Sequence, residues 1–193
     1  MTNFQNANFI KSVAEYSFAP NDNLSEVLIV GKSNVGKSSL INALCNKKRL
    51  AFTSSKPGHT RLLNYFNIDN KFYLVDAPGY GYSKIGKNLD LIFSSMMDDY
   101  FQHSKKIKLT LLLLDARREM SADDLEIIHF LETTGIKYFV VITKVDKTNQ
   151  SERALFKAYL KEQNINTNIF FTSSENVKTL EPLKKEIEKC LFY

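Results

Sequence analysis

The chain contains, at residues 31–38, the stretch Gly31-Lys32-Ser33-Asn34-Val35-Gly36-Lys37-Ser38, which Ser39 follows. This stretch matches the phosphate-binding pattern G-x-x-x-x-G-K-[ST] at every fixed position. The five residues before it, 26–30, predict a short buried strand, and residues 39–46 predict an amphipathic helix. Because a strand that enters a helix through such a loop directs backbone N–H groups and the positive helix end at one point, the stretch predicts a phosphate site in an α/β fold.

Each fixed residue of this loop has a physical reason. Gly31 and Gly36 let the backbone turn tightly and approach phosphate oxygens that a Cβ would obstruct. Lys37 supplies a point charge for the β- and γ-phosphates, and the Ser38 hydroxyl is a hard oxygen ligand suited to Mg²⁺. The loop alone leaves open whether the base is adenine or guanine, and whether the protein is a kinase, an ATPase or a switch.

Length and composition indicate one ordinary folded domain. The 193 residues are 44% hydrophobic and 24% charged, which argues against bulk disorder. Lys and Arg number 26 against 21 acidic residues, and the resulting net charge of +5 permits a polyanionic partner without requiring one. The basic clusters, which could equally be solvated loop faces, are Lys47-Lys48-Arg49, Lys105-Lys106-Lys108 and Arg117-Arg118.

Two further features indicate a cytoplasmic protein. Cys45 and Cys190 form no C-x-x-C motif and fall on apolar helix faces, as expected for reduced core thiols. Residues 1–11 lack the apolar core of a signal peptide, and the longest apolar run, 109–114, is too short to cross a bilayer.

The remaining pattern alternates strands with helices. Strands are expected at 62–68, 72–76, 107–114, 138–142 and 168–171, and helices at 89–103, 121–131, 151–163 and 177–191. Asp69-Asn70-Lys71 predicts a hairpin turn, so one strand should run antiparallel to the others. The expected fold is a three-layer α/β nucleotide-binding domain over residues 25–193, with about six mostly parallel strands, helices on both faces, and residues 1–24 as a lead-in that packs on it.

A second motif, Asp76-Ala77-Pro78-Gly79, comes where the strand at 72–76 ends. An Asp at this edge of a parallel sheet can hold Mg²⁺ through water, and Gly79 can offer its N–H to a γ-phosphate. The pattern D-x-x-G is weak alone. In a chain that also carries the phosphate-binding loop, it indicates nucleoside triphosphate chemistry.

A third motif, Thr143-Lys144-Val145-Asp146, follows the strand at 138–142. The Asp146 carboxylate can accept hydrogen bonds from N1–H and the 2-amino group of guanine, an arrangement that adenine lacks. Loss of this pair should cost about 2–4 kcal/mol, so the motif predicts GTP rather than ATP. The Lys144 stem can lie over the base plane. Thr143 stands where Asn is common, which predicts a weaker link to the phosphate-binding loop.

The three motifs and Thr60 occur in the order typical of translation-factor-class GTPases, and finer details resemble the EngB (YihA/YsxC) family. The resemblance covers roughly residues 25–176, and its most specific part is the run Pro78-Gly79-Tyr80-Gly81-Tyr82. Lys56-Pro57-Gly58-His59-Thr60 and the leading Phe9-Ile10-Lys11-Ser12 also resemble that family, although His59 replaces the usual Arg or Lys.

The resemblance implies a single-domain bacterial GTPase that acts in large (50S) ribosomal subunit assembly, with defects that surface in cell division and septation. It implies rRNA and ribosomal proteins as partners, with no membrane or DNA, and a monomer. Ser38 and Thr60 would ligate Mg²⁺, Asp76 would reach it through water, and Lys37, Thr60 and Gly79 would act in catalysis. The nucleotide would contact the phosphate-binding loop, Ser39 and four further segments. These are the first switch (Gly58, His59, Thr60, Arg61 and Leu62), the D-x-x-G motif (Asp76, Ala77, Pro78 and Gly79), the third motif (Thr143, Lys144, Val145 and Asp146) and a last loop (Thr172, Ser173 and Ser174). In that last loop, the Ser174 N–H could bond guanine O6.

Two mechanistic expectations concern Tyr80 and Asn34. Tyr80 stands where many GTPases hold a water-positioning Gln, so intrinsic hydrolysis should be slow. In related GTPases with G-x-x-N-x-G-K-S, the Asn helps to hold K⁺ beside the phosphates, and we hypothesise the same role for Asn34. Two competing interpretations stay open: a nucleotide-gated rRNA-binding module with incidental hydrolysis, using Lys47-Lys48-Arg49 and the tyrosines near Tyr82, and an ATP-dependent nucleoside kinase, which would leave Asp146 unexplained.

Overall fold

The computed structural model describes residues 1–52, 62–81 and 87–193, and for residues 87–94 it describes the backbone alone. Tyr82, Gly58, His59, Thr60 and Arg61 therefore lie outside the described residues. Of the expected first-switch residues, only Leu62 is placed, and its side chain is exposed.

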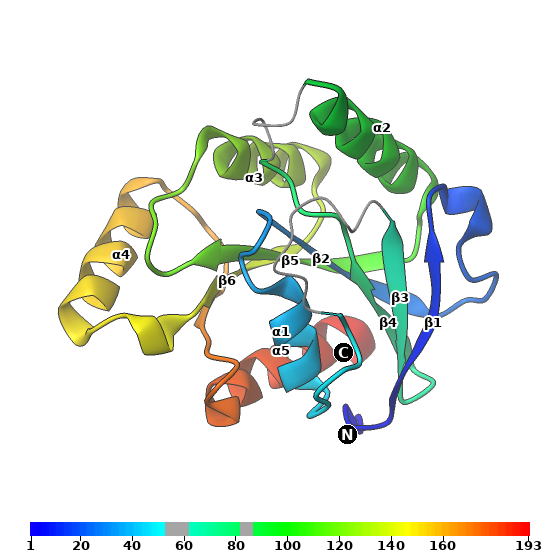
Figure 1. The fold of residues 1–193 in the computed structure, drawn as a ribbon, viewed down its shortest axis with the longest axis horizontal. Coiled ribbons are helices and arrows are strands. Elements are labelled where there is room, and N and C mark those ends of the chain that lie inside the picture. The colour runs from blue at the N-terminus through cyan, green and yellow to red at the C-terminus, as the bar shows by residue number, and fades with distance from the viewer. Residues whose placement is uncertain (53–61, 82–86) are drawn as a thin grey trace.

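A single sheet of seven strands forms the middle layer, in the order β1-β3-β4-β2-β5-β6-β7 (Figure 1). Strand β3 runs antiparallel to both of its neighbours, and all other neighbouring pairs are parallel. The strands are β1 (Ala7–Val13), β2 (Ser25–Gly31), β3 (Leu63–Ile68), β4 (Phe72–Asp76), β5 (Ile107–Asp115), β6 (Tyr138–Thr143) and β7 (Ile169–Phe171). The fold is the expected α/β class, with one more strand than the expected six.

The additional strand, β1, comes from the lead-in. Only its end residues, Ala7 and Val13, are buried, and the five residues between them are not. Its sequence therefore lacks the alternation by which a half-buried strand is recognised. Backbone pairing with β3 across the edge of the sheet holds it instead.

Helices cover both faces of the sheet (Figure 1). Alternate residues of β2 divide between two cores, with Leu28 and Val30 on one face and Val27 and Ile29 on the other. The first core is closed by α2 (Lys87–His103), α3 (Ala122–Thr134) and α4 (Gln150–Glu162), and the second by α1 (Lys37–Leu44) and α5 (Glu181–Phe192). Since both faces are buried, the central strands are continuous apolar runs.

The helix boundaries follow local chemistry. Ser121 and Asp124 form the expected capping box at the start of α3. The last helix begins at Glu181, not at Val177 as the apolar spacing predicts, and a 3-10 helix, Val177–Leu180, precedes it. Pro182 explains the difference, because it has no N–H to donate to the carbonyl group one turn earlier and is tolerated only in the first turn.

In the part of the chain that the structure describes, no helix combines the length and apolarity needed to span a bilayer.

Candidate functional site

Four neighbouring strands end at the same edge of the sheet, and each ends on a residue of chemical interest. The carboxyl ends of β4, β2, β5 and β6 are Asp76, Gly31, Asp115 and Thr143. Strand β2 lies between β4 and β5, the strands that precede and follow α2 in the chain, and ligands of open α/β sheets bind at such a switch in strand order. The sheet therefore brings the three sequence motifs together.

The phosphate-binding loop joins β2 to α1 as expected. Gly36 is the cap of α1 and has φ +113°, which L side chains rarely adopt. Lys37 folds back so that its Nζ donates to the carbonyl oxygen of Gly31 at 3.4 Å. The first N–H groups of α1 and the Lys37 ammonium thus share one end of the helix, which is a favourable arrangement for an anion.

Asp76 and Lys37 are a buried acid and a buried base. Burial disfavours the charged form of each, and the charge of the other group partly offsets this effect. Asp76 is 4% exposed, and its Oδ1 has no hydrogen-bond partner among the described residues. Burial raises the pKa of Asp76 to about 6, and the nearby Lys37 opposes that shift. Burial likewise lowers the pKa of Lys37, with Asp76 opposing. A buried carboxylate oxygen without a protein partner is suited to a cation or to its bound water.

The D-x-x-G segment lies directly against the phosphate-binding loop. A Cβ on Gly79 would stand 2.7 Å from Ser33 Cα and 3.2 Å from Lys37 Nζ, so no larger residue fits without a shift. The Ser33 N–H donates to the Tyr80 carbonyl oxygen at 3.1 Å. Any group that binds Lys37 is therefore close to the Gly79 backbone.

The Tyr80 phenol is directed to α3. The Tyr80 ring is buried, and its hydroxyl donates to Asp124 Oδ1 at 2.5 Å. Asp124 Oδ2 accepts from the N–H and hydroxyl of Ser121, so the phenol joins the cap of α3. This placement is consistent with the expectation that Tyr80 does not position a water as Gln does; the hydrolysis rate itself stays a prediction.

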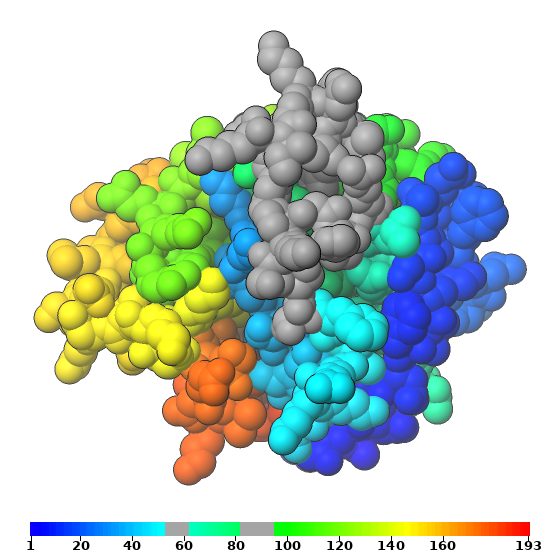
Figure 2. Space-filling view, in the orientation of Figure 1, coloured from blue at the N-terminus to red at the C-terminus, as the bar shows by residue number. Residues whose placement is uncertain are grey.

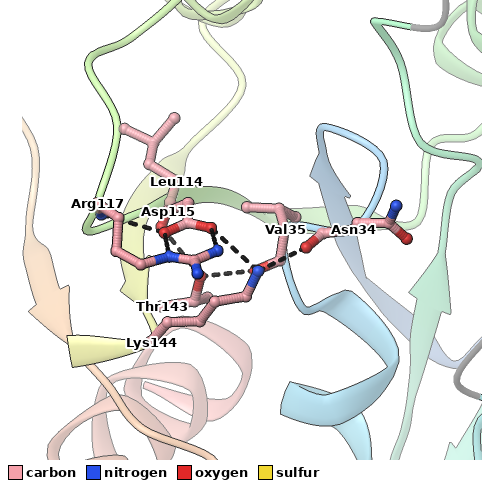
Figure 3. A network of polar contacts seen from close by, with 7 residues as sticks. All are labelled: Asn34, Val35, Leu114, Asp115, Arg117, Thr143 and Lys144. Atoms are coloured by element: carbon pink, nitrogen blue, oxygen red, sulfur yellow. Dashed lines mark hydrogen bonds and ion pairs between the residues drawn. The ribbon is translucent and has the colours of Figure 1, made fainter. Parts of the chain in front are cut away.

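Thr143 links β6 to the phosphate-binding loop through its hydroxyl. The Thr143 hydroxyl lies 2.7 Å from the Val35 carbonyl oxygen and 3.1 Å from the Leu114 carbonyl oxygen (Figure 3). Its single proton serves one acceptor at a time, but either bond ties β6 to a neighbouring segment. The short threonine side chain can make this bond because β6 ends close to the phosphate-binding loop. Thr143 therefore does bond the phosphate-binding loop, and that this link is weaker than one made by Asn stays a prediction.

Asp146 and Ser173 form the other side of the expected base site. Ser173 is buried, and its hydroxyl donates to Asp146 Oδ1 at 2.6 Å. This hydrogen bond is the main cause that lowers the pKa of Asp146, against the opposing effect of burial. The Val145 N–H donates to the Thr172 carbonyl oxygen, which joins the two loops, whereas Ser174 is exposed. The carboxylate is thus held ionised, as a double acceptor for guanine requires.

Comparison with known proteins agrees with this geometry. Residues 26–144 match the family model described as 50S ribosome-binding GTPase. A probable GTP-binding protein EngB of Mycoplasma mycoides subsp. mycoides is 43% identical over 185 residues, which are 95% of this chain and 92% of that protein. The chain belongs to the EngB family. The EngB relative of Chlorobaculum tepidum is 44% identical over 152 residues, 79% of each chain.

Solved structures support the same membership. A crystal structure of a probable EngB superimposes with a TM-score of 0.68 at 25% identity, covering 86% of this chain and 98% of that one. Era in complex with MgGDPNP and a fragment of 16S ribosomal RNA superimposes with a TM-score of 0.65 at 31% identity, covering 89% of this chain and 58% of Era. As an EngB-family protein, the chain is a GTP-binding protein that hydrolyses GTP.

Sequence reasoning did not single out Asp115, which lies at the same edge of the sheet. Its carboxylate accepts from Arg117 Nε at 2.9 Å and from Lys144 Nζ at 3.0 Å. The signal was present, because Asp115 ends an apolar strand just as Asp76 does. The pairing with Lys144 depends on strand register, in which Asp115 lies opposite Thr143, and register is not visible in the sequence.

Proposed function

We propose that this protein is a Mg²⁺-dependent GTP switch that acts in the cytoplasm in large (50S) ribosomal subunit assembly. The observation that carries the switch is the contact of Gly79 with Ser33 and Lys37. A γ-phosphate held by Lys37 would meet the D-x-x-G backbone, so its presence or loss would move that segment. The family description, 50S ribosome-binding GTPase, supports the large subunit as the partner. Disturbed division and septation would follow indirectly from failed assembly.

The residues present fit a Mg²⁺ ion. Ser38 offers a hydroxyl at the first turn of α1, and Asp76 offers a buried carboxylate oxygen without a protein partner. No group of three His, Cys, Asp or Glu side chains that could hold a metal occurs among the described residues, so the nucleotide would complete the ligand set. When bound, Mg²⁺ neutralises charge on the β- and γ-phosphate oxygens. The family resemblance adds Thr60 as a ligand.

In this proposal, one set of side chains binds the guanine base and another set binds the phosphates. Asp146, held by Ser173, accepts the guanine N–H groups, and Lys144 covers the base with its stem. Lys37 and the Gly79 N–H stabilise negative charge that develops as the γ-phosphate leaves. Asn34, exposed at the tip of the loop, would hold K⁺, an idea that fails if turnover is equal in K⁺ and Na⁺ buffers of equal ionic strength.

Cosedimentation with purified large ribosomal subunits tests the proposal. The purified protein is mixed with subunits in a non-hydrolysable GTP analogue, in GDP, or without nucleotide. Binding with the analogue alone is expected. Asp146→Ala should abolish this binding, while Glu162→Gln, at the far end of α4, should not change it. Equal binding in all three conditions would contradict the switch, and no binding would contradict the partner.

One surface favours the alternative function, a nucleotide-gated rRNA-binding module with incidental hydrolysis. The segment 46–52 after α1 carries exposed Lys48 and Arg49, and Phe52 at 88% exposure. Figure 2 shows this segment in cyan on the front surface, beside the N-terminal residues in blue. Basic and aromatic side chains together are typical of contacts with single-stranded RNA. Salt-sensitive affinity for isolated rRNA that requires a bound guanine nucleotide, but is equal with GDP and with the GTP analogue, would support this alternative.

A further inference from the structure

A network of charges connects the carboxyl ends of β5 and β6 with the phosphate-binding loop (Figure 3). Asp115 stands at its centre, with a side chain that is 8% exposed. Arg117 Nη2 and Lys144 Nζ both approach Asp115 Oδ2, at 2.7 Å and 3.0 Å. Burial alone would raise the pKa of Asp115, but hydrogen bonds from Arg117 and Lys144 outweigh it and hold that pKa well below its usual range.

Lys144 spans this network. Its Nζ also donates to the Asn34 carbonyl oxygen at 2.7 Å, so its ammonium lies between the phosphate-binding loop and Asp115. Its backbone is left-handed, with φ 58°. A lysine side chain has many rotamers, and immobilising it lowers entropy. Because Asp115 fixes the head of Lys144 within the folded protein, that entropy is lost on folding and not on nucleotide binding.

We propose that Asp115 is a positioning residue for guanine nucleotide binding that acts through Lys144. The inference rests on the proposed guanine site, in which the Lys144 stem covers the base. The Asp115 carboxylate and the Asn34 carbonyl oxygen both bond one ammonium, so the Lys144 stem spans from the end of β6 to the phosphate-binding loop. Arg117 bonds both oxygens of the same carboxylate, and its own side chain is 44% exposed.

The first variant is Asp115→Asn, which keeps the shape and removes the charge. The dissociation constants for GDP and GTP should both rise about tenfold, because Lys144 loses its charged partner. The kcat at saturating GTP should stay within twofold, since no group at the γ-phosphate changes. Asp69→Asn is the matched control: it removes another paired carboxylate, bound to Lys71 in the β3–β4 turn, and should leave nucleotide affinity unchanged.

A double-mutant cycle separates positioning from a structural role. Lys144→Met alone should weaken GDP binding, and adding Asp115→Asn to it should weaken binding by less than a further twofold. If the two effects multiply, or if Asp115→Asn alone leaves affinity unchanged, the inference is overturned while the guanine site stands. If Lys144→Met itself leaves GDP affinity unchanged, the proposed role of Lys144 at the base is wrong as well.

Arg117→Ala provides a test that does not depend on the folding of the Asp115 variant. The half-exposed Arg117 can be removed while Asp115 still holds Lys144, so GDP affinity should fall less than threefold. A loss as large as that expected for Asp115→Asn would mean that the carboxylate serves Arg117, and would overturn the inference.

Discussion

The two halves of the nucleotide site are stabilised in opposite ways. In the base half, Asp115 is paired with Arg117 and Lys144, and Asp146 with Ser173, so both carboxylates have a lowered pKa. In the phosphate half, Asp76 Oδ1 has no partner among the described residues, and burial raises the Asp76 pKa to about 6. The carboxylates of the base half are therefore paired within the protein, whereas the proposed phosphate and cation would stabilise the charges of the phosphate half.

Lys37→Met should separate the two halves with the largest effect. GTP turnover should fall at least about 100-fold, because a charge aimed at the transferring phosphate is lost. Guanosine, which has no phosphate, should bind within threefold of the unsubstituted protein, as measured by competition with a fluorescent GDP. Lys161→Met on the exposed side of α4 is the control. A large loss of guanosine affinity would contradict the division into halves.

Ser173→Ala should affect the base half alone. The Asp146 carboxylate would lose its hydrogen bond from Ser173, and GDP affinity should fall about tenfold because a bond to a charged group is worth about 1.5–3 kcal/mol. Ser174→Ala is the matched control, since the Ser174 side chain is exposed and its backbone N–H is retained. Calorimetric titration with GDP measures both variants. Equal losses would show that the loop, not the Ser173 hydroxyl, supports Asp146.

Asp76→Asn should change how stability depends on pH. Folded Asp76 keeps its proton up to about pH 6, whereas the unfolded chain releases it near pH 4, so the folded state binds more protons in this window and stability falls as pH rises through it. Removing the charge should stabilise the nucleotide-free protein by about 2–3 kcal/mol at pH 7, because the raised pKa of Asp76 already includes the attraction to Lys37.

Urea denaturation of this variant at pH 4.5 and pH 7 makes the measurement. The stabilising effect should fall to about 1 kcal/mol at pH 4.5, where folded Asp76 is protonated but the unfolded chain still releases most of that proton. A variant that is less stable than the unsubstituted protein at both pH values would mean that Asp76 is stabilised within the protein, contrary to the comparison.

Tyr80→Phe should have the smallest effect. It removes one buried hydroxyl and should lower stability by about 1 kcal/mol, while kcat stays within twofold because the phenol hydroxyl is bonded to Asp124 of α3. Tyr138→Phe, which removes a similar hydrogen bond to Glu132, is the control. A tenfold change in kcat for Tyr80→Phe alone would assign the phenol to the reaction.

The sequence allowed the phosphate half to be predicted more fully than the base half. Gly31, Gly36, Lys37 and Asp76 belong to motifs whose geometry is local to one strand and its following loop. Other contacts join segments that are far apart in the sequence, namely Asp115 with Lys144 and Thr143 with Val35. Whether such contacts form depends on strand register and on distances in the folded protein. Strand β1 was not predicted, because a strand that pairs at the sheet edge through its backbone does not need alternating apolar and polar residues.

Hydrogen exchange tests the contrast between the two halves most directly. The backbone N–H groups of residues 143–146 and 172–173 should exchange slowly without nucleotide and gain little protection from GDP. Residues 76–80 should exchange faster without nucleotide and become strongly protected only with Mg²⁺ and a non-hydrolysable GTP analogue. Equal protection of both segments without nucleotide, or a larger gain in the base half, would contradict the account.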